Sequence, residues 1–123
     1  MARVLVVDDT RVMRYNMKKL LEELGHDVVG EAANGHEAIV QYKSLEPDVV
    51  TLDITMPPVN DVADGIDALK SIVEYDEDVK AIMMTAHGEK AKVMEALRSG
   101  ASGYLLKPIQ KAKLDEAIKK LNL

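Results

Sequence analysis

The chain has 123 residues, of which 47% are hydrophobic, so it has the length of one domain and enough apolar material for a core. Its net charge of −5 and the restriction of its aromatic residues to four tyrosines argue against nucleic acid as a partner, since no basic field or base-stacking platform is available. The lack of cysteine excludes disulfides and thiolate metal sites, and no apolar run approaches the roughly 20 residues that span a bilayer. We therefore expect a single cytoplasmic domain over residues 1–123 that does not insert into a membrane.

Segments typical of strands and helices alternate along the whole chain. Short apolar runs of the kind that buried parallel strands need predict strands at residues 3–7, about 28–32, 49–52, 79–84 and 103–106. Apolar residues at helical spacing predict helices at about residues 11–24, 38–45, 66–73, 89–98 and 110–121. This alternation predicts an α/β fold, a doubly wound five-stranded parallel sheet flanked by five helices.

Reactive side chains stand at the ends of four predicted strands. Asp8 and Asp9 follow the first strand, Asp53 the third, Thr85 the fourth and Lys107 the fifth. Because the carboxyl ends of parallel strands meet at one edge of a sheet, where ligands bind, we expect these residues to lie together. Three carboxylates, a hydroxyl and an ammonium group would suit a hard cation and a phosphoryl group.

The individual positions also have simpler interpretations. Asp8 and Asp9 could be caps of the helix that follows them, Lys107 a surface lysine before a proline, and Thr85 an ordinary strand residue. The ordered set, rather than any one member, favours a site. There Asp9 and Asp53 would be direct ligands of Mg²⁺, with Asp8 holding a metal-bound water. Asp53 could itself be a nucleophile that forms an aspartyl phosphate, with the cation and Lys107 neutralising charge on the transferred group.

Four motifs coincide with these strand ends, namely Val4-Leu5-Val6-Val7-Asp8-Asp9, Asp53-Ile54-Thr55-Met56-Pro57, Thr85-Ala86 and Leu106-Lys107-Pro108. With the turn Gly35-His36-Glu37-Ala38, they make the entire chain resemble the receiver domains of two-component response regulators. Single-domain, CheY-like chemotaxis regulators are the nearest type. The resemblance implies the flavodoxin-like strand order 2-1-3-4-5.

The resemblance also implies a role for each residue of the expected site. Asp53 would be the phosphoacceptor, and Asp8, Asp9, Asp53 and the backbone carbonyl of Thr55 would hold Mg²⁺, for which Mn²⁺ could substitute. Lys107 would contact the phosphoryl group and precede a cis proline.

Further positions of the family concern switching, lifetime and output. Thr85 would move toward the phosphoryl group, and Tyr104 would rotate inward behind it. Thr55 and His87 match the two positions that tune the lifetime of the phosphoryl group. The expected output face, on the fourth helix and fifth strand, consists of Lys90, Val93 and Tyr104.

These roles predict a stand-alone response regulator without an output domain, most plainly one of chemotaxis or flagellar control. It would take a phosphoryl group from a sensor histidine kinase and then, as a monomer, bind a flagellar switch or an adaptor protein. A phosphatase is a further expected partner. The chain would be no enzyme beyond catalysing its own phosphotransfer and slow autodephosphorylation.

Two other functions stay open. The chain could be a phosphorelay intermediate that passes the group to another histidine. A phosphatase with an aspartyl-phosphate intermediate is less favoured, because such enzymes carry an Asp-x-Asp pattern after the first strand, where this chain has adjacent Asp8 and Asp9.

One segment departs from the family pattern. The step from Pro57 to Gly65 is about three residues longer than usual. It could contact a partner, cover Asp53, or be a neutral insertion of the kind that loops tolerate cheaply. Asp61 and Asp64 within it could also strengthen cation binding.

Overall fold

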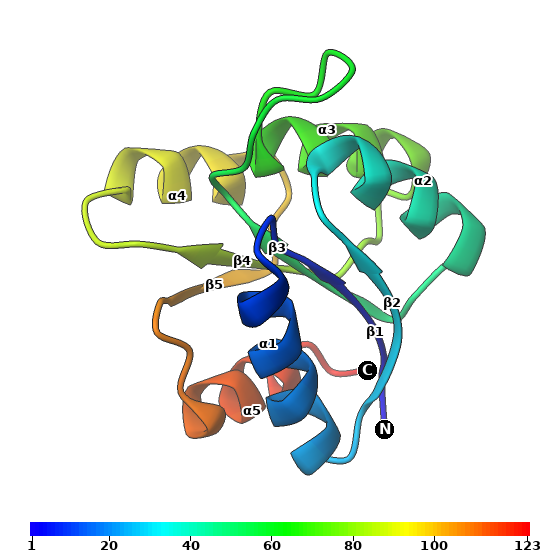
Figure 1. The fold of residues 1–123 in the computed structure, drawn as a ribbon, viewed down its shortest axis with the longest axis vertical. Coiled ribbons are helices and arrows are strands. Elements are labelled where there is room, and N and C mark those ends of the chain that lie inside the picture. The colour runs from blue at the N-terminus through cyan, green and yellow to red at the C-terminus, as the bar shows by residue number, and fades with distance from the viewer.

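The computed structural model describes residues 1–123 as a five-stranded sheet with helices on both faces (Figure 1). The strands are β1 (Arg3–Val7), β2 (Asp27–Ala32), β3 (Val49–Asp53), β4 (Ala81–Thr85) and β5 (Gly103–Leu106). The helices are α1 (Arg11–Glu23), α2 (Gly35–Leu45), α3 (Gly65–Tyr75), α4 (Lys90–Arg98) and α5 (Lys111–Lys119). All neighbouring strands are parallel, in the order β2-β1-β3-β4-β5. The predicted fold and strand order are confirmed.

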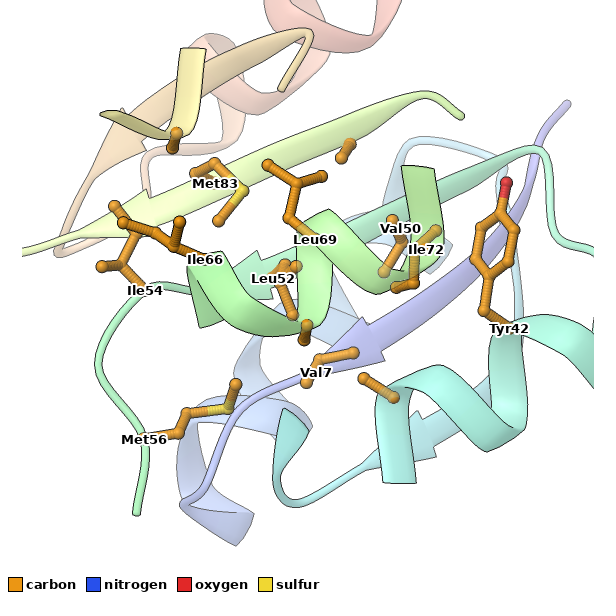
Figure 2. Close-up of a cluster of buried hydrophobic side chains, with 14 of the residues drawn as sticks. Val7, Tyr42, Val50, Leu52, Ile54, Met56, Ile66, Leu69, Ile72 and Met83 are labelled. Atoms are coloured by element: carbon orange, nitrogen blue, oxygen red, sulfur yellow. The ribbon is translucent and has the colours of Figure 1, made fainter. Parts of the chain in front are cut away.

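Two hydrophobic clusters, one on each face of the sheet, hold the layers together. α1 and α5 cover one face, and α2, α3 and α4 cover the other (Figure 1). Because side chains alternate along a strand, Val4 and Val6 of β1 join the cluster under α1 and α5, whereas Leu5 and Val7 join the cluster under the other three helices. Figure 2 shows this second, larger cluster, in which side chains of α3 lie over those of β1, β3 and β4.

None of the five helices combines the length and the apolar character needed to cross a membrane.

The long segment between β3 and α3 is an ordered hairpin. Val59 and Val62 form an antiparallel bridge and exchange backbone hydrogen bonds of 3.0 Å in both directions. Asn60 and Asp61 between them have φ values of 48° and 67°, as a type I′ turn requires of both central residues. The hairpin projects beyond α3 (Figure 1), while the side chain of Val62 is buried and anchors it.

Candidate functional site

The register of the sheet brings the predicted site residues to one edge. β1 ends at Val7, which pairs with Leu52 of β3, so Asp8 and Asp53 follow at neighbouring positions. Asp53 in turn pairs with the residue that precedes Thr85 in β4. The parallel pairing therefore gathers side chains that are far apart in the chain, as the strand ends predicted.

Three carboxylates form a cluster at this edge. Asp8, Asp9 and Asp53 each offer one oxygen, and these oxygens all lie within 4.8 Å of one another. Asp8 and Asp53 are buried, whereas Asp9 is exposed. Carboxylate oxygens this close fit a hard divalent cation, which would also relieve their mutual repulsion. Asp61 and Asp64, which we expected near the cation, lie outside this cluster, and Asp64 is instead the N-cap of α3.

The interpretation of Asp8 and Asp9 as helix caps is wrong. The N-cap of α1 is Thr10, whose hydroxyl accepts a hydrogen bond of 3.3 Å from the backbone N–H of Met13. Asp8 accepts a hydrogen bond of 3.0 Å from the backbone N–H of Thr10, which fixes the carboxylate at the strand end. Both aspartates therefore remain available at the sheet edge.

Lys107 reaches into the carboxylate cluster from β5. Its Nζ donates hydrogen bonds to Oδ2 of Asp53 (2.9 Å) and Oδ2 of Asp8 (3.2 Å). The peptide bond between Lys107 and Pro108 is cis, as expected. Burial works to lower the pKa of Lys107, but the hydrogen bond and charge attraction of Asp53 outweigh it, so the pKa is raised and the ammonium form is favoured. Lys107 is thus a fixed positive charge beside Asp53.

The surroundings of Asp53 shift the pKa of its carboxyl group in opposite directions. Burial raises its pKa from 3.8 to about 6, since removal from water disfavours the charged form. Lys107 opposes this rise through its hydrogen bond and charge, while the nearby carboxylates of Asp8 and Asp9 add to it. At neutral pH the carboxyl group of Asp53 is still ionised. It is buried, and Lys107 compensates part of its charge, which is a setting that suits a nucleophile.

Thr85 and Thr55 share a hydrogen-bond partner that the sequence interpretation missed. Oε1 of Glu89 accepts a hydrogen bond from Oγ1 of Thr85 (3.1 Å), and Oε2 accepts one from Oγ1 of Thr55 (2.5 Å). Oε1 also accepts a hydrogen bond of 2.8 Å from the backbone N–H of Ala86. Glu89 is the residue directly before α4 and makes no side-chain capping hydrogen bond to that helix, so no local capping pattern in the sequence pointed to these contacts.

The expected output residues divide into exposed and buried positions. Tyr104 is 49% exposed, and Lys90 is exposed at the start of α4. Val93 is only 7% exposed and belongs to the core cluster under α4, so it contributes little exposed surface to the expected output face. The helix turns Val93 and Ala96 inward together, as a spacing of three residues requires. The large exposed apolar residues of α4 and β5 are Met94, Leu97, Tyr104 and Leu106.

A pocket of about 230 Å³ lies between Thr85 and Tyr104. Val93 and Leu106 line it, as does the exposed side chain of His87. Thr85 and Tyr104 therefore border the same pocket.

Comparison with known proteins agrees with this geometry. The model of the response regulator receiver domain family matches residues 4–119, which include every residue of the carboxylate cluster and Lys107. The chain therefore belongs to the response regulator receiver domain family.

Within that family the chain is CheY-like. It is 45% identical to the chemotaxis protein CheY of Thermotoga maritima over 98% of this chain and 97% of that protein. It is 43% identical to CheY of Bacillus subtilis, over 96% of this chain and 95% of that protein. Its fold matches a chain in the crystal structure of the CheX-CheY-BeF₃-Mg²⁺ complex of Borrelia burgdorferi with a TM-score of 0.90 and 33% identity, over 98% and 89% of the two chains. The chain is thus a signalling module of the two-component, chemotaxis type.

Proposed function

We propose that the chain is a stand-alone response regulator whose Asp53 accepts a phosphoryl group from a phosphohistidine of a sensor kinase. The observation that carries the proposal is the buried carboxylate of Asp53, which stands 2.9 Å from Nζ of Lys107 and inside a cluster of carboxylates suited to a cation. The CheY relatives, matched over nearly their whole length, support a receiver of the CheY type.

In the transfer, a carboxylate oxygen of Asp53 forms a bond to phosphorus, and the phosphorus–nitrogen bond of the phosphohistidine breaks. The electron pair of that bond stays on the donor imidazole. Lys107 offsets negative charge on the transferred oxygens, and the hydroxyl of Thr85 binds one of them afterwards. Asp9, Asp53 and the carbonyl of Thr55 would hold Mg²⁺, with Asp8 orienting a water, and the bound ion would further neutralise the phosphoryl oxygens.

Phosphorylation is proposed to change the surface formed by α4, β5 and α5. When Thr85 moves toward the phosphoryl group, the pocket behind it gives the ring of Tyr104 room to turn inward. Exposed Lys90 and Tyr104 then present a different face to a target, which fits a flagellar switch or adaptor protein. The complex of Borrelia burgdorferi CheY with CheX, beryllofluoride and Mg²⁺ supports binding of a protein partner in the activated state.

The lifetime of the phosphoryl group is proposed to depend on Thr55 and His87. Both side chains are exposed beside the site, where they can affect access of water to the phosphorus. Hydrolysis on Asp53 would be slow, and a separate phosphatase would shorten it.

Labelling with acetyl phosphate in Mg²⁺ tests the proposal. Wild-type protein should gain one phosphoryl group by intact mass spectrometry, and Asp53→Asn should gain none, because an amide cannot form the acyl phosphate. Equal labelling of the Asn variant would disprove the assignment of Asp53. A phosphorelay intermediate would differ by handing its label to a histidine phosphotransfer protein instead of binding a target.

A further inference from the structure

Glu89 connects the two loops that flank Asp53. It stands directly before α4, and its carboxylate accepts hydrogen bonds from Thr55 in the loop after β3 and from Thr85 at the end of β4. Every polar contact of this carboxylate lies within the site region, apart from Nζ of Lys92 at 4.0 Å. The side chain therefore belongs to the edge of the proposed phosphorylation site.

Both oxygens of Glu89 accept hydrogen bonds. Oε1 binds the hydroxyl of Thr85 (3.1 Å) and the backbone N–H of Ala86 (2.8 Å), and Oε2 binds the hydroxyl of Thr55 (2.5 Å). The hydrogen bond from Thr55 is the largest cause that lowers the pKa of Glu89, so the group is a carboxylate at neutral pH. Hydrogen bonds to an ionised acceptor are stronger than neutral ones.

The contact with Thr85 conflicts with the role of Thr85 in phosphorylation. A threonine hydroxyl has one hydrogen to donate, and here Oε1 of Glu89 accepts it, with the carbonyl oxygen of Ala86 (3.3 Å) as the only other acceptor found. A phosphoryl group on Asp53 needs that same hydrogen. Thr85 must therefore leave Glu89 before it can bind the phosphoryl oxygen.

We propose that Glu89 is a positioning residue that holds Thr85 and Thr55 in the resting arrangement and competes with the phosphoryl group for the hydroxyl of Thr85. The proposal rests on phosphorylation of Asp53. A phosphoryl group of about −2 charge attracts the donor more strongly than a carboxylate of −1, so phosphorylation releases Glu89. Because Glu89 is the residue directly before α4, its release frees the start of the helix that borders the proposed output surface.

The test is a calorimetric titration with beryllofluoride in Mg²⁺, an analogue of the phosphoryl group on Asp53. In Glu89→Ala no hydrogen bond to Thr85 has to be broken, so we expect beryllofluoride to bind about tenfold more tightly than to wild type, the scale of one charge-assisted hydrogen bond. Glu89→Gln keeps an acceptor for one threonine and should gain less than Glu89→Ala. This variant preserves the shape of the side chain and serves if the alanine variant folds poorly, which thermal unfolding will show.

Two controls separate this role from a simple change of charge. Glu95→Ala removes the same charge from the region of α4, but Glu95 pairs with Lys70 rather than with a threonine of the site. The affinity of this variant for beryllofluoride should therefore stay within about twofold of wild type. In a Thr85→Ala background the gain from Glu89→Ala should largely disappear, because the two residues act through one hydrogen bond.

The outcomes are distinct. Equal or weaker binding by Glu89→Ala, or by Glu89→Gln if only that variant folds, overturns the proposal, as does an undiminished gain in the Thr85→Ala background, which would leave charge repulsion as the cause. If wild type binds no beryllofluoride and takes no label from acetyl phosphate, phosphorylation of Asp53 itself fails. Binding by wild type without the expected gain refutes only the role of Glu89.

Discussion

Asp53 and Lys107 illustrate how burial and charge compete at a single side chain. Burial favours the protonated form of Asp53, and the hydrogen bond from Lys107 favours the ionised form. The pKa of Asp53 is raised to about 6. The ionised side chain is therefore less stable in the folded protein than it would be in water. The buried, ionised carboxylate therefore lowers the stability of the fold at neutral pH, a cost that is common at functional sites.

Asp53→Asn should therefore stabilise the metal-free protein at neutral pH. The pKa of Asp53 is about 6 in the folded chain against 3.8 ordinarily, so between these values the native state binds more protons and the free energy of unfolding falls as pH rises. Above pH 6 the full cost remains, and the neutral amide avoids it. We expect a gain of about 1–2 kcal/mol at pH 7.5 after allowance for solvent screening, and no gain below about pH 4.

Urea unfolding in EDTA over this pH range measures the effect. Asp115→Asn, at a partly exposed helix position paired with Lys119, is the control and should change stability little at any pH. A less stable Asp53→Asn at pH 7.5 would mean that the ion pair with Lys107 outweighs the cost of burial. Lys107 would still have Asp8 as a partner in the variant.

At the scale of elements, the start of α3 packs closely against the backbone of Asp53. The N–H of Gly65 donates a hydrogen bond of 2.8 Å to the carbonyl oxygen of Ile54. A Cβ at Gly65 would overlap the carbonyl oxygen of Asp53. The hairpin of residues 59–62 thus returns the chain to a position that only glycine can occupy.

Gly65→Ala should consequently damage both stability and phosphorylation. The added methyl group must displace the backbone at Asp53 or the start of α3, which we expect to cost at least about 2 kcal/mol and to slow labelling by acetyl phosphate. Chemical unfolding and mass spectrometry measure the two effects.

Gly103→Ala is the matched control, because a Cβ at Gly103 in β5 meets nothing within 4 Å. It should label at the wild-type rate and unfold at nearly the wild-type urea concentration. If Gly65→Ala behaved like Gly103→Ala, the close approach of α3 to Asp53 would have no energetic importance.

The sequence predicted the elements well and some of their contacts poorly. Apolar runs that end in a polar residue identify buried strands and their reactive ends, because both depend on local sequence. The burial of Val62 depends instead on α2, where a Cβ at Gly35 would lie 2.5 Å from Cγ1 of Val62. The inward position of Val93 was predictable from its spacing to Ala96, although we expected Val93 on the output face.

At the scale of the whole molecule, the candidate site and the proposed output surface are separate regions that share β4 and β5. Thr85 ends β4 beside Asp53, and Tyr104 stands on β5 with the pocket between them.

The strand order came from family resemblance, since alternating strands and helices alone leave several orders possible. The contacts of Glu89 were beyond prediction, because they join two loops whose relative position exists only after the sheet has formed.

Tyr104→Ala should separate phosphorylation from output. Its labelling by acetyl phosphate should stay within about twofold of wild type, whereas binding of its beryllofluoride form to the target should weaken by about tenfold or more, the loss typical of a central aromatic contact. The target is the protein captured by wild type only with beryllofluoride and Mg²⁺ together. Tyr15→Ala, at an exposed tyrosine of α1, should bind that target normally. Normal binding by Tyr104→Ala would remove the ring from the proposed switch.

The central claim, that Asp53 carries the phosphoryl group, is tested most directly by locating the acyl phosphate. After labelling with acetyl phosphate and Mg²⁺, borohydride reduces an aspartyl phosphate to homoserine, which peptide mass spectrometry can place in the chain. We predict homoserine at position 53 alone, and only when the divalent cation is present. In Lys107→Ala the homoserine should be absent or strongly reduced. Homoserine at position 8 or 9, or label retained on a histidine, would contradict the account.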